Sequence, residues 1–201
     1  MKRFAALIAL SLAALLGGCA TSRIVDSQVI AVANVPAGVQ LQGAHYRFER
    51  LPSQAANPEA GLAEQQAEQA LASVGLVRDD AAAQFSVLVG FQGTQYLADP
   101  WGYPYPAGTY GSLSIGRGAP WGSGVGFGMG MRFPPTSQYH REVSLILRDL
   151  RSGQVVYETR ASHDGPWGDS TTIFATLFKA ALAHFPNPPA GPQRVNIEIP
   201  R

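Results

Sequence analysis

Four histidines are the side chains best suited to acid–base chemistry, and one of them stands in a suggestive trio. Ser162, His163 and Asp164 are consecutive and supply the three residue types of a serine hydrolase. Successive side chains of a strand point to opposite faces, so adjacency does not assemble a triad, and no Gly-x-Ser-x-Gly sequence occurs. The remaining histidines form no His-x-x-x-His pair. We therefore identify no catalytic residues, no metal site and no cofactor site.

Cys19, the single cysteine, is the other residue whose position indicates chemistry. Lys2 and Arg3 precede 13 residues, Phe4 to Leu16, that are apolar except for Ser11. This order is typical of the charged and apolar regions of an export signal. A membrane-spanning helix needs about 20 apolar residues, so this run is too short to span.

The residues around Cys19 resemble the lipobox of bacterial lipoproteins. Leu16, Gly17, Gly18 and Cys19 follow its Leu-small-small-Cys pattern. The resemblance implies cleavage between Gly18 and Cys19, a diacylglycerol thioether on Cys19 and acylation of the new amino terminus. Two or more acyl chains anchor a protein stably where one does not. Because Ala20, and not Asp, follows the cysteine, the resemblance also implies sorting to the outer membrane, with the domain facing the periplasm.

Composition restricts the choice of partner. Removal of the signal, residues 1–18, leaves 13 Lys and Arg against 14 Asp and Glu, a formal charge of −1. A nearly neutral chain without a basic run is not typical of nucleic-acid binding, which depends on neutralising phosphates. We expect membrane lipid to be contacted through acylated Cys19, and another envelope protein or a glycan to be the possible further partner.

Apolar patterning predicts a domain over residues 23–201, after a tether at 19–22. Alternation predicts strands near 24–32, 45–49, 85–92, 138–150 and 155–159, with a short last strand at 195–199. Helical spacing predicts helices over 58–74, begun by Asn57-Pro58 and ended by Gly75, and from Asp169 or Ser170 to Pro186. Arg151-Ser152-Gly153 is short enough to join an antiparallel hairpin.

A segment of glycine, proline and aromatic residues, 93–137, interrupts this pattern. Long loops inside compact domains are usually functional or disordered. Three interpretations remain open: a flexible insertion, an extended hairpin over Gly124 to Met131, and an exposed platform for a ligand or glycan. The hairpin would have glycines on one face and could cover a core edge or add to a partner's sheet. The platform residues are aromatic, and the candidate contact surface comprises Trp101, Tyr103, Tyr105, Tyr110, Trp121 and Phe127.

Several strand and helix segments together resemble a known family. They are Tyr46-Arg47-Phe48, Ala72 to Leu76, Phe85 to Val89, Val143 to Asp149, Gln154 to Arg160 and His184-Phe185-Pro186. The series is similar to Gram-negative envelope lipoproteins of the domain of unknown function 4136. The resemblance implies an α+β fold, a small antiparallel sheet of about five strands with two amphipathic helices on one face. It supplies no catalytic residues.

These observations favour an outer-membrane lipoprotein with a non-enzymatic binding or structural role. The alternative is an envelope hydrolase whose groups, including His163 and Asp164, converge only in three dimensions. Exposed apolar or aromatic clusters on the uncovered sheet face would favour binding, whereas a closed pocket that gathers His and Asp would favour catalysis.

Overall fold

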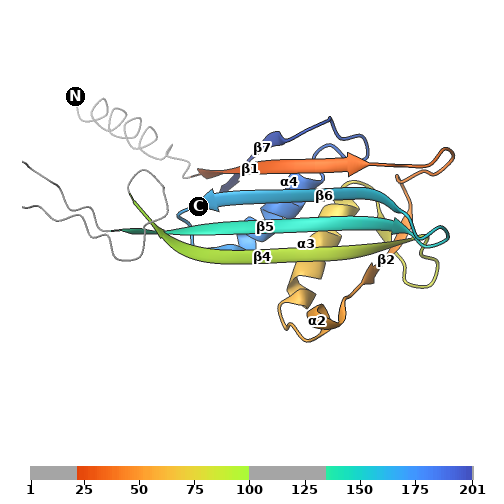
Figure 1. The fold of residues 1–201 in the computed structure, drawn as a ribbon, viewed down its shortest axis with the longest axis horizontal. Coiled ribbons are helices and arrows are strands. Elements are labelled where there is room, and N and C mark those ends of the chain that lie inside the picture. Colours follow the sequence, from red (N-terminus) through yellow and green to blue (C-terminus); the bar gives the residue numbers. More distant parts are fainter. Residues whose placement is uncertain (1–21, 100–134, 201) are drawn as a thin grey trace, which may run out of the picture.

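The computed structural model describes residues 22–99 and 135–200, which form a single sheet with its two longer helices on one face (Figure 1). The strands are β1 (Ser22–Ala33), β2 (His45–Glu49), β3 (Val77–Arg78), β4 (Phe85–Ala98), β5 (Thr136–Asp149), β6 (Val155–Gly165) and β7 (Gln193–Pro200). The helices in this part of the chain are α2 (Pro52–Ala55), α3 (Ala60–Ser73) and α4 (Ser170–Ala181). The strand order is β3-β2-β4-β5-β6-β1-β7.

The expected small antiparallel sheet of about five strands with two helices was wrong. The described residues form a mixed seven-stranded sheet and three helices. β2 pairs in parallel with both β3 and β4, because the chain crosses over through α2 and α3 between them. All other pairings are antiparallel. β3 has two residues and α2 has four, too few for either to show a periodic pattern.

The hairpin between β5 and β6 follows the predicted turn. Gly153 takes the left-handed conformation at φ 73°, which only glycine adopts without strain. The Asp149 carboxylate accepts hydrogen bonds from the amides of Arg151 and Ser152, both at 2.8 Å. These bonds lower the pKa of Asp149 and hold the turn closed.

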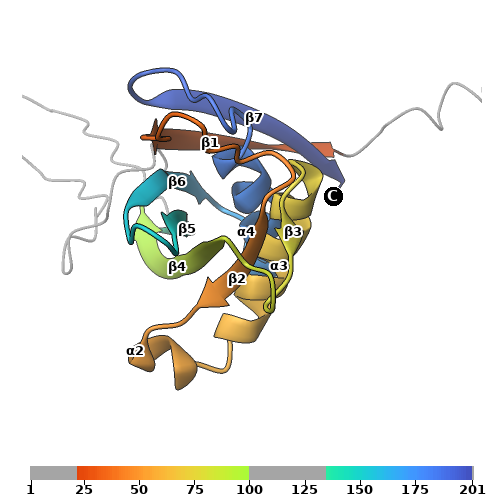
Figure 2. The same cartoon turned by 90° about the vertical axis from the view of Figure 1, so that its right-hand side faces the viewer.

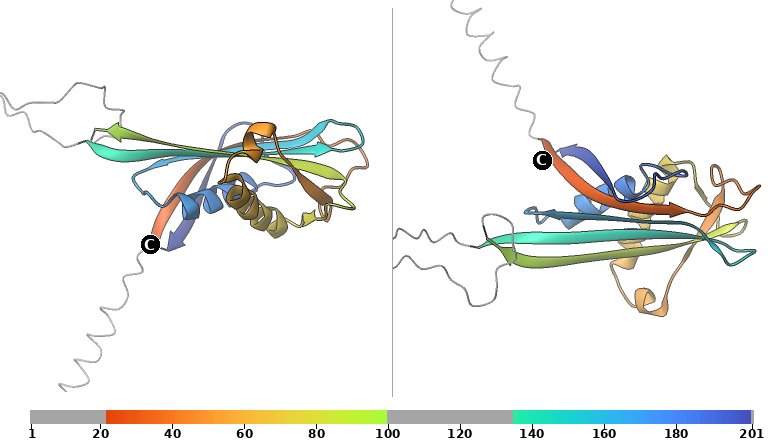
Figure 3. Two further views of the ribbon diagram at one scale, coloured as in Figure 1. Left: turned by 90° about the horizontal axis from the view of Figure 1, so that it is seen from below. Right: turned by 45° about the horizontal axis from the view of Figure 1, so that its top comes forward.

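Both longer helices cover the same face of the sheet, as the edge-on view shows (Figure 3, left), and the sheet bends around them (Figure 2). Val143, Leu145 and Leu147 alternate along β5 and are completely buried beneath α4. The predicted cap of α4 is confirmed, since the Asp169 carboxylate accepts from the Thr172 amide at 3.2 Å. Gly75, with φ 89°, follows α3 as predicted.

The α3 helix starts later than the sequence indicated. It begins at Ala60, and Asn57 Oδ1 accepts from the Glu59 amide at 2.9 Å, one turn before the regular helix. The preceding α2 helix makes a hydrogen bond to the sheet. Gln54 of α2 donates to the Val89 carbonyl at 2.6 Å, just beyond the point where β2 stops pairing with β4.

The boundaries of the 93–137 segment also differ from expectation. β4 continues to Ala98 and β5 starts at Thr136, and Ala98 pairs with Thr136. Because β6 pairs with β5 only from Tyr139 onward, residues 136–138 pair with β4 alone. The two strands thus project as an arm past β6 (Figure 1). The hairpin proposed for Gly124 to Met131 lies outside the described residues.

Candidate functional site

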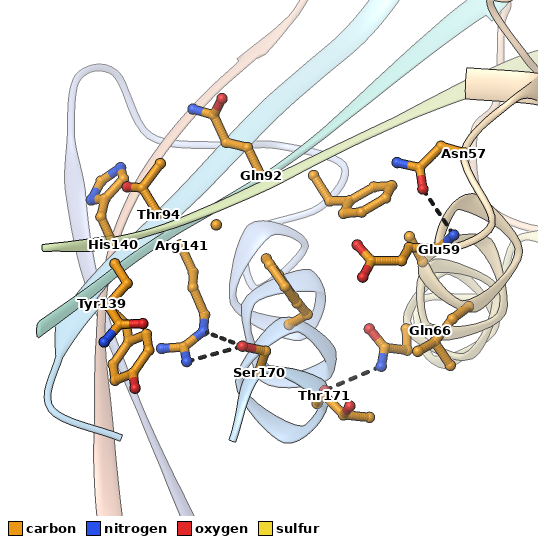
Figure 4. Close-up of a pocket in the computed structure, with 16 residues that line it drawn as sticks. Asn57, Glu59, Gln66, Gln92, Thr94, Tyr139, His140, Arg141, Ser170 and Thr171 are labelled. Atoms are coloured by element: carbon orange, nitrogen blue, oxygen red, sulfur yellow. Dashed lines mark hydrogen bonds between the residues drawn. The ribbon is translucent and has the colours of Figure 1, made fainter. Parts of the chain in front are cut away.

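A cavity of about 530 Å³ opens between the sheet and the first turns of α3 and α4. Strands β4 and β5 form its floor, on the face that the helices cover. Figure 4 shows which polar side chains lie on the helix side of these strands, namely Glu59, Gln66, Tyr139, Arg141, Ser170 and Thr171, whereas Gln92, Thr94 and His140 lie on the other side. Ligand pockets in proteins commonly have volumes of about 300–1,000 Å³ and combine apolar walls with a few polar groups. Both properties apply here.

Arg141 is the most unusual residue of this cavity. It follows the alternation of Val143 and Leu145 along β5, so its side chain points toward the helices, and the residue is only 1% exposed. Burial lowers the pKa of its guanidinium, with a partial opposing effect from Tyr139 and Asp169. Arginine still carries its charge under such conditions because its usual pKa exceeds 12.

The Arg141 guanidinium is only partly satisfied. Nε and Nη2 donate to Ser170 Oγ at 3.1 and 3.0 Å, and Nη2 donates to the Trp167 carbonyl at 2.7 Å. Nη1 is buried and has no hydrogen-bond partner. Within the described residues no carboxylate forms an ion pair with Arg141. The guanidinium also lies over the Tyr139 ring, 4.8 Å from its centroid, and the Asp169 carboxylate attracts it from outside ion-pair distance, so the buried charge is only partly balanced.

The start of α4 adds to this positive environment. Ser170 is the first residue of α4, and Figure 4 shows the Arg141 side chain reaching it. The first turn of a helix carries a partial positive charge. Gln66 of α3 donates to the Thr171 carbonyl at 3.1 Å, which ties the two helices together at the cavity.

Another side of the cavity is an apolar wall. The rings of Phe91 and Phe174 meet edge to face, with centroids 6.1 Å apart and an interplanar angle of 83°. Leu62 and Ala63 of α3 line the same cavity. Gly93 lies directly beside the Phe174 ring, since a Cβ there would be in van der Waals contact with Phe174 Cζ at 3.4 Å.

The structure separates the two members of the candidate hydrolase pair. His163 faces the helices and is buried, and its Nδ1 lies 2.7 Å from the Asp26 carbonyl. Asp164 faces the other side of β6 and lies 3.1 Å from His140 Nδ1. The strand also continues to Gly165, beyond the end predicted near residue 159. His163 and Asp164 therefore do not converge.

The other predicted site residues lie outside the described part of the chain. These are the lipidation and cleavage residues Gly18 and Cys19 and the aromatic contact residues Trp101, Tyr103, Tyr105, Tyr110, Trp121 and Phe127. Among residues 22–99 and 135–200, no helix is long and apolar enough to cross a membrane. The same ranges contain no group of three or more His, Cys, Asp or Glu residues placed to hold a metal ion.

The fold and cavity define a class: an α+β domain in which a mixed sheet, covered on one face by two helices, encloses a partly polar pocket. The sequence profile of the domain of unknown function (DUF4136) matches residues 37–187. The chain belongs to this family, which confirms the resemblance seen in the sequence.

Comparison with solved structures supports the fold alone. A PDZ domain protein from Parabacteroides distasonis superposes with a TM-score of 0.50 at 14% identity, over 88% of this chain. This chain spans 39% of that protein's length. The PelC dodecamer from Paraburkholderia phytofirmans gives a TM-score of 0.45 at 14% identity, over 81% of this chain and 99% of that one. No curated protein matches the sequence significantly.

The cavity was missed at the level of sequence, although one signal pointed to it. In the predicted strand 138–150, Arg141 is in phase with the apolar residues Val143, Leu145 and Leu147. A charged residue on the apolar side of a strand needs a special environment. Ser170 was identified only as a possible cap, and Gln66 was not identified as a site residue.

Proposed function

We propose that this protein is a lipoprotein anchored in the outer membrane through acylated Cys19, that it faces the periplasm, and that it acts by binding rather than by catalysis. The single observation that carries the binding role is the cavity at the start of α3 and α4, where aromatic walls meet a buried arginine. The anchoring role rests on the sequence around Cys19.

The composition of the cavity supports binding over catalysis. Catalytic pockets usually bring a nucleophile into contact with a base. Ser170 instead accepts two hydrogen bonds from Arg141, a group that cannot act as a base at neutral pH. His140 contributes to the cavity lining, but its ring nitrogen lies against Asp164 on the other side of the sheet. The polar groups are thus suited to hold a ligand.

The uncovered face of the sheet offers less support for a binding role. Its central rows are polar or charged, and include Glu142, Ser144, Arg160 and Ser162. Antiparallel sheets commonly expose one such face to water. Three exposed apolar residues of this face, Ile24, Ile30 and Val32, lie along β1, but aromatic residues do not cluster on it within the described ranges. The cavity, which combines aromatic walls with polar groups, is therefore the better candidate for ligand contact.

The anchor is tested by a Cys19→Ser substitution in cells. We expect loss of the acyl mass and release from the membrane fraction, since one hydroxyl cannot accept the thioether-linked lipid. Ser22→Ala, three residues away, serves as the matched control and should remain lipidated. Unchanged mass and membrane association of the Cys19 variant would refute the anchor.

Sorting is tested separately by Ala20→Asp. We expect this variant to keep its lipid but to move from the outer to the inner membrane fraction, as lipoproteins with Asp after the cysteine do. Retention in the outer membrane would contradict the role given to Ala20 while leaving lipidation of Cys19 intact.

Binding is tested by photo-cross-linking in living cells. A photoreactive residue at Leu62, 47% exposed and lining the cavity, is compared with one at Ile30, 50% exposed on the uncovered face. We expect a reproducible adduct from position 62 and none from position 30. Adducts of equal yield at both positions, or none at either, would contradict a binding role for the cavity.

The aromatic segment is a second candidate contact surface because the projecting arm of β4 and β5 leads into it. Photoreactive probes at Trp101, Trp121 and Phe127 test it in the same cells. If no specific adduct forms and deletion of 100–134 produces no phenotype, contact through this segment is refuted.

A further inference from the structure

We propose, as a refinement of the binding role above, that the cavity recognises a monoanionic carboxylate attached to an apolar or aromatic body. The carboxylate would lie toward Arg141 and the start of α4, and the apolar body would lie against Phe91 and Phe174. The observation behind this assignment is a buried arginine that has no carboxylate partner in the described chain.

The charge of Arg141 is what selects an anion. Its side chain is removed from water, and Nη1 makes no hydrogen bond. Ser170 Oγ and the Trp167 carbonyl carry no charge to balance it. In a site of low effective dielectric, such a charge acts strongly on a ligand of opposite sign. Guanidinium groups pair well with planar carboxylates.

The first turn of α4 acts in the same direction. Ser170 and Thr171 line the cavity at the end of α4 that carries the partial positive charge. This helix end and the unpaired Arg141 Nη1 come from different elements, α4 and β5. Because the Asp169 carboxylate already caps this helix end, the buried Arg141 Nη1 is the stronger of the two groups that favour an anion at this end of the cavity.

A carboxylate on the side of the cavity opposite Arg141 limits the charge of the ligand. Glu59 lines the cavity next to α3, and Figure 4 shows it on the far side from Arg141. One buried positive charge balances one negative charge, and a second would meet the Glu59 carboxylate. A single carboxylate therefore suits the site better than a phosphate dianion or a dicarboxylate.

The apolar wall accounts for the rest of the ligand. Phe91, Phe174 and Leu62 supply surface that gains free energy when an apolar group displaces water from it, about 25 cal/mol per Å² buried. Aromatic rings also pack well edge to face. A cavity of about 530 Å³ is larger than a free carboxylate requires.

The test uses full-length lipidated protein in nanodiscs and ligand-observed ¹⁹F NMR, with empty nanodiscs as the blank. The probes are 4-fluorobenzoate and its neutral isostere 4-fluorobenzamide, which share a ring and differ in charge. We expect the benzoate to bind about tenfold or more tightly than the benzamide, the ratio that one hydrogen bond to a charged group supplies. Inorganic phosphate should compete weakly.

Three variants assign the effect to its cause. Arg141→Met should abolish the preference for benzoate, so that the ratio of the two affinities falls to about one. Arg160→Met makes the same substitution on the uncovered face and should leave both affinities unchanged. Gly93→Leu fills the cavity beside Phe174 without altering charge, so it should weaken both probes. If Arg141→Met does not fold, Gly93→Leu and the pair of probes still decide the result.

The outcomes separate this assignment from the binding role itself. Equal affinities for the two probes, both weakened by Gly93→Leu, would overturn carboxylate recognition but leave a binding cavity. A preference for benzoate that survives Arg141→Met would also overturn it. Failure of both probes to bind would overturn it as well, and the cross-link at position 62 would then test the binding role independently.

Discussion

Arginine residues on the two faces of the sheet differ in their burial and in their partners. On the uncovered face, Arg160 Nε lies 3.5 Å from Glu142 Oε1, and Arg148 Nε lies 3.8 Å from Glu49 Oε2. On the covered face, Arg141 has no such carboxylate and is nearly inaccessible to water. Exposed pairs contribute little because water already solvates both charges. Arg141, which is removed from water and has a buried Nη1 without a hydrogen-bond partner, is the arginine suited to recognise a ligand.

The contrast between the faces also applies to packing. Residues that alternate along one strand differ completely in burial, so substitutions at adjacent positions should have very different effects. Four predictions follow from this contrast, ordered from the largest expected change in the free energy of unfolding to the smallest.

Leu145→Ala and Ile146→Ala compare neighbouring residues of β5. Leu145 is fully buried against the helices, whereas Ile146 is partly exposed on the uncovered face. We expect Leu145→Ala to cost about 2–5 kcal/mol through lost burial and a cavity, and Ile146→Ala to cost about 1 kcal/mol. Urea denaturation measures both. Similar costs would contradict the assignment of the core to one face.

Gly165→Ala and Gly90→Ala compare two glycines that both lack space for a Cβ. At Gly165 the Cβ would lie 2.6 Å from Nε2 of His163, whose ring is stacked on Trp167 and held by the Asp26 carbonyl. At Gly90 it would lie 2.3 Å from Ser144 Oγ, a hydroxyl on the uncovered face that can rotate away.

We therefore expect Gly165→Ala to lower the free energy of unfolding by about 1–3 kcal/mol, as overpacking does. Gly90→Ala should change it by less than about 0.5 kcal/mol. Thermal denaturation followed by circular dichroism distinguishes them. A larger loss for Gly90→Ala would show that the His163 ring, and not the Ser144 hydroxyl, yields easily.

The stability that Asp169 contributes at the start of α4 depends on pH. Its pKa is lowered from 3.8 by hydrogen bonds from Thr172 and by Arg23, whose Nη2 lies 2.7 Å away. A lowered folded-state pKa means that this stabilisation is fully present above pH 3.8 and is lost as pH falls through the lower value.

Asp169→Asn should therefore flatten the acid limb of the stability curve below about pH 4, since Asn still caps a helix but does not titrate. Urea denaturation at a series of pH values provides the measurement. An unchanged slope in the Asp169 variant would contradict the role of its charge.

The smallest effect is expected for the surface pair of Arg160 and Glu142. Arg160→Gln should lower the free energy of unfolding by less than about 0.5 kcal/mol, and 1 M NaCl should remove that difference. A double-mutant cycle with Glu142→Gln isolates the pair. A salt-resistant coupling above about 1 kcal/mol would show that the uncovered face is less solvated than its exposure indicates.

Periodic patterns predicted the principal strands, both longer helices and the Asp169 cap, because residues that share a face recur at fixed spacing. The same patterns failed for β3 and α2, which are too short to repeat. They also failed for the parallel pairing of β2, since the direction of pairing depends on the crossover through α3. The far ends of β4 and β5 were assigned to a loop because their residues do not alternate in polarity.

The sequence by itself determined the family, the principal strands, both longer helices and the fact that Arg141 is in phase with core residues of its strand. These depend on spacing along the chain, which is visible without coordinates. Only the tertiary structure decided that Arg141 donates to Ser170 and that both residues line one cavity with Phe91 and Phe174. It also decided that His163 and Asp164 lie on opposite faces of the sheet. Such contacts join β4, β5, α3 and α4 across many residues, and side chains acquire them only when the elements pack.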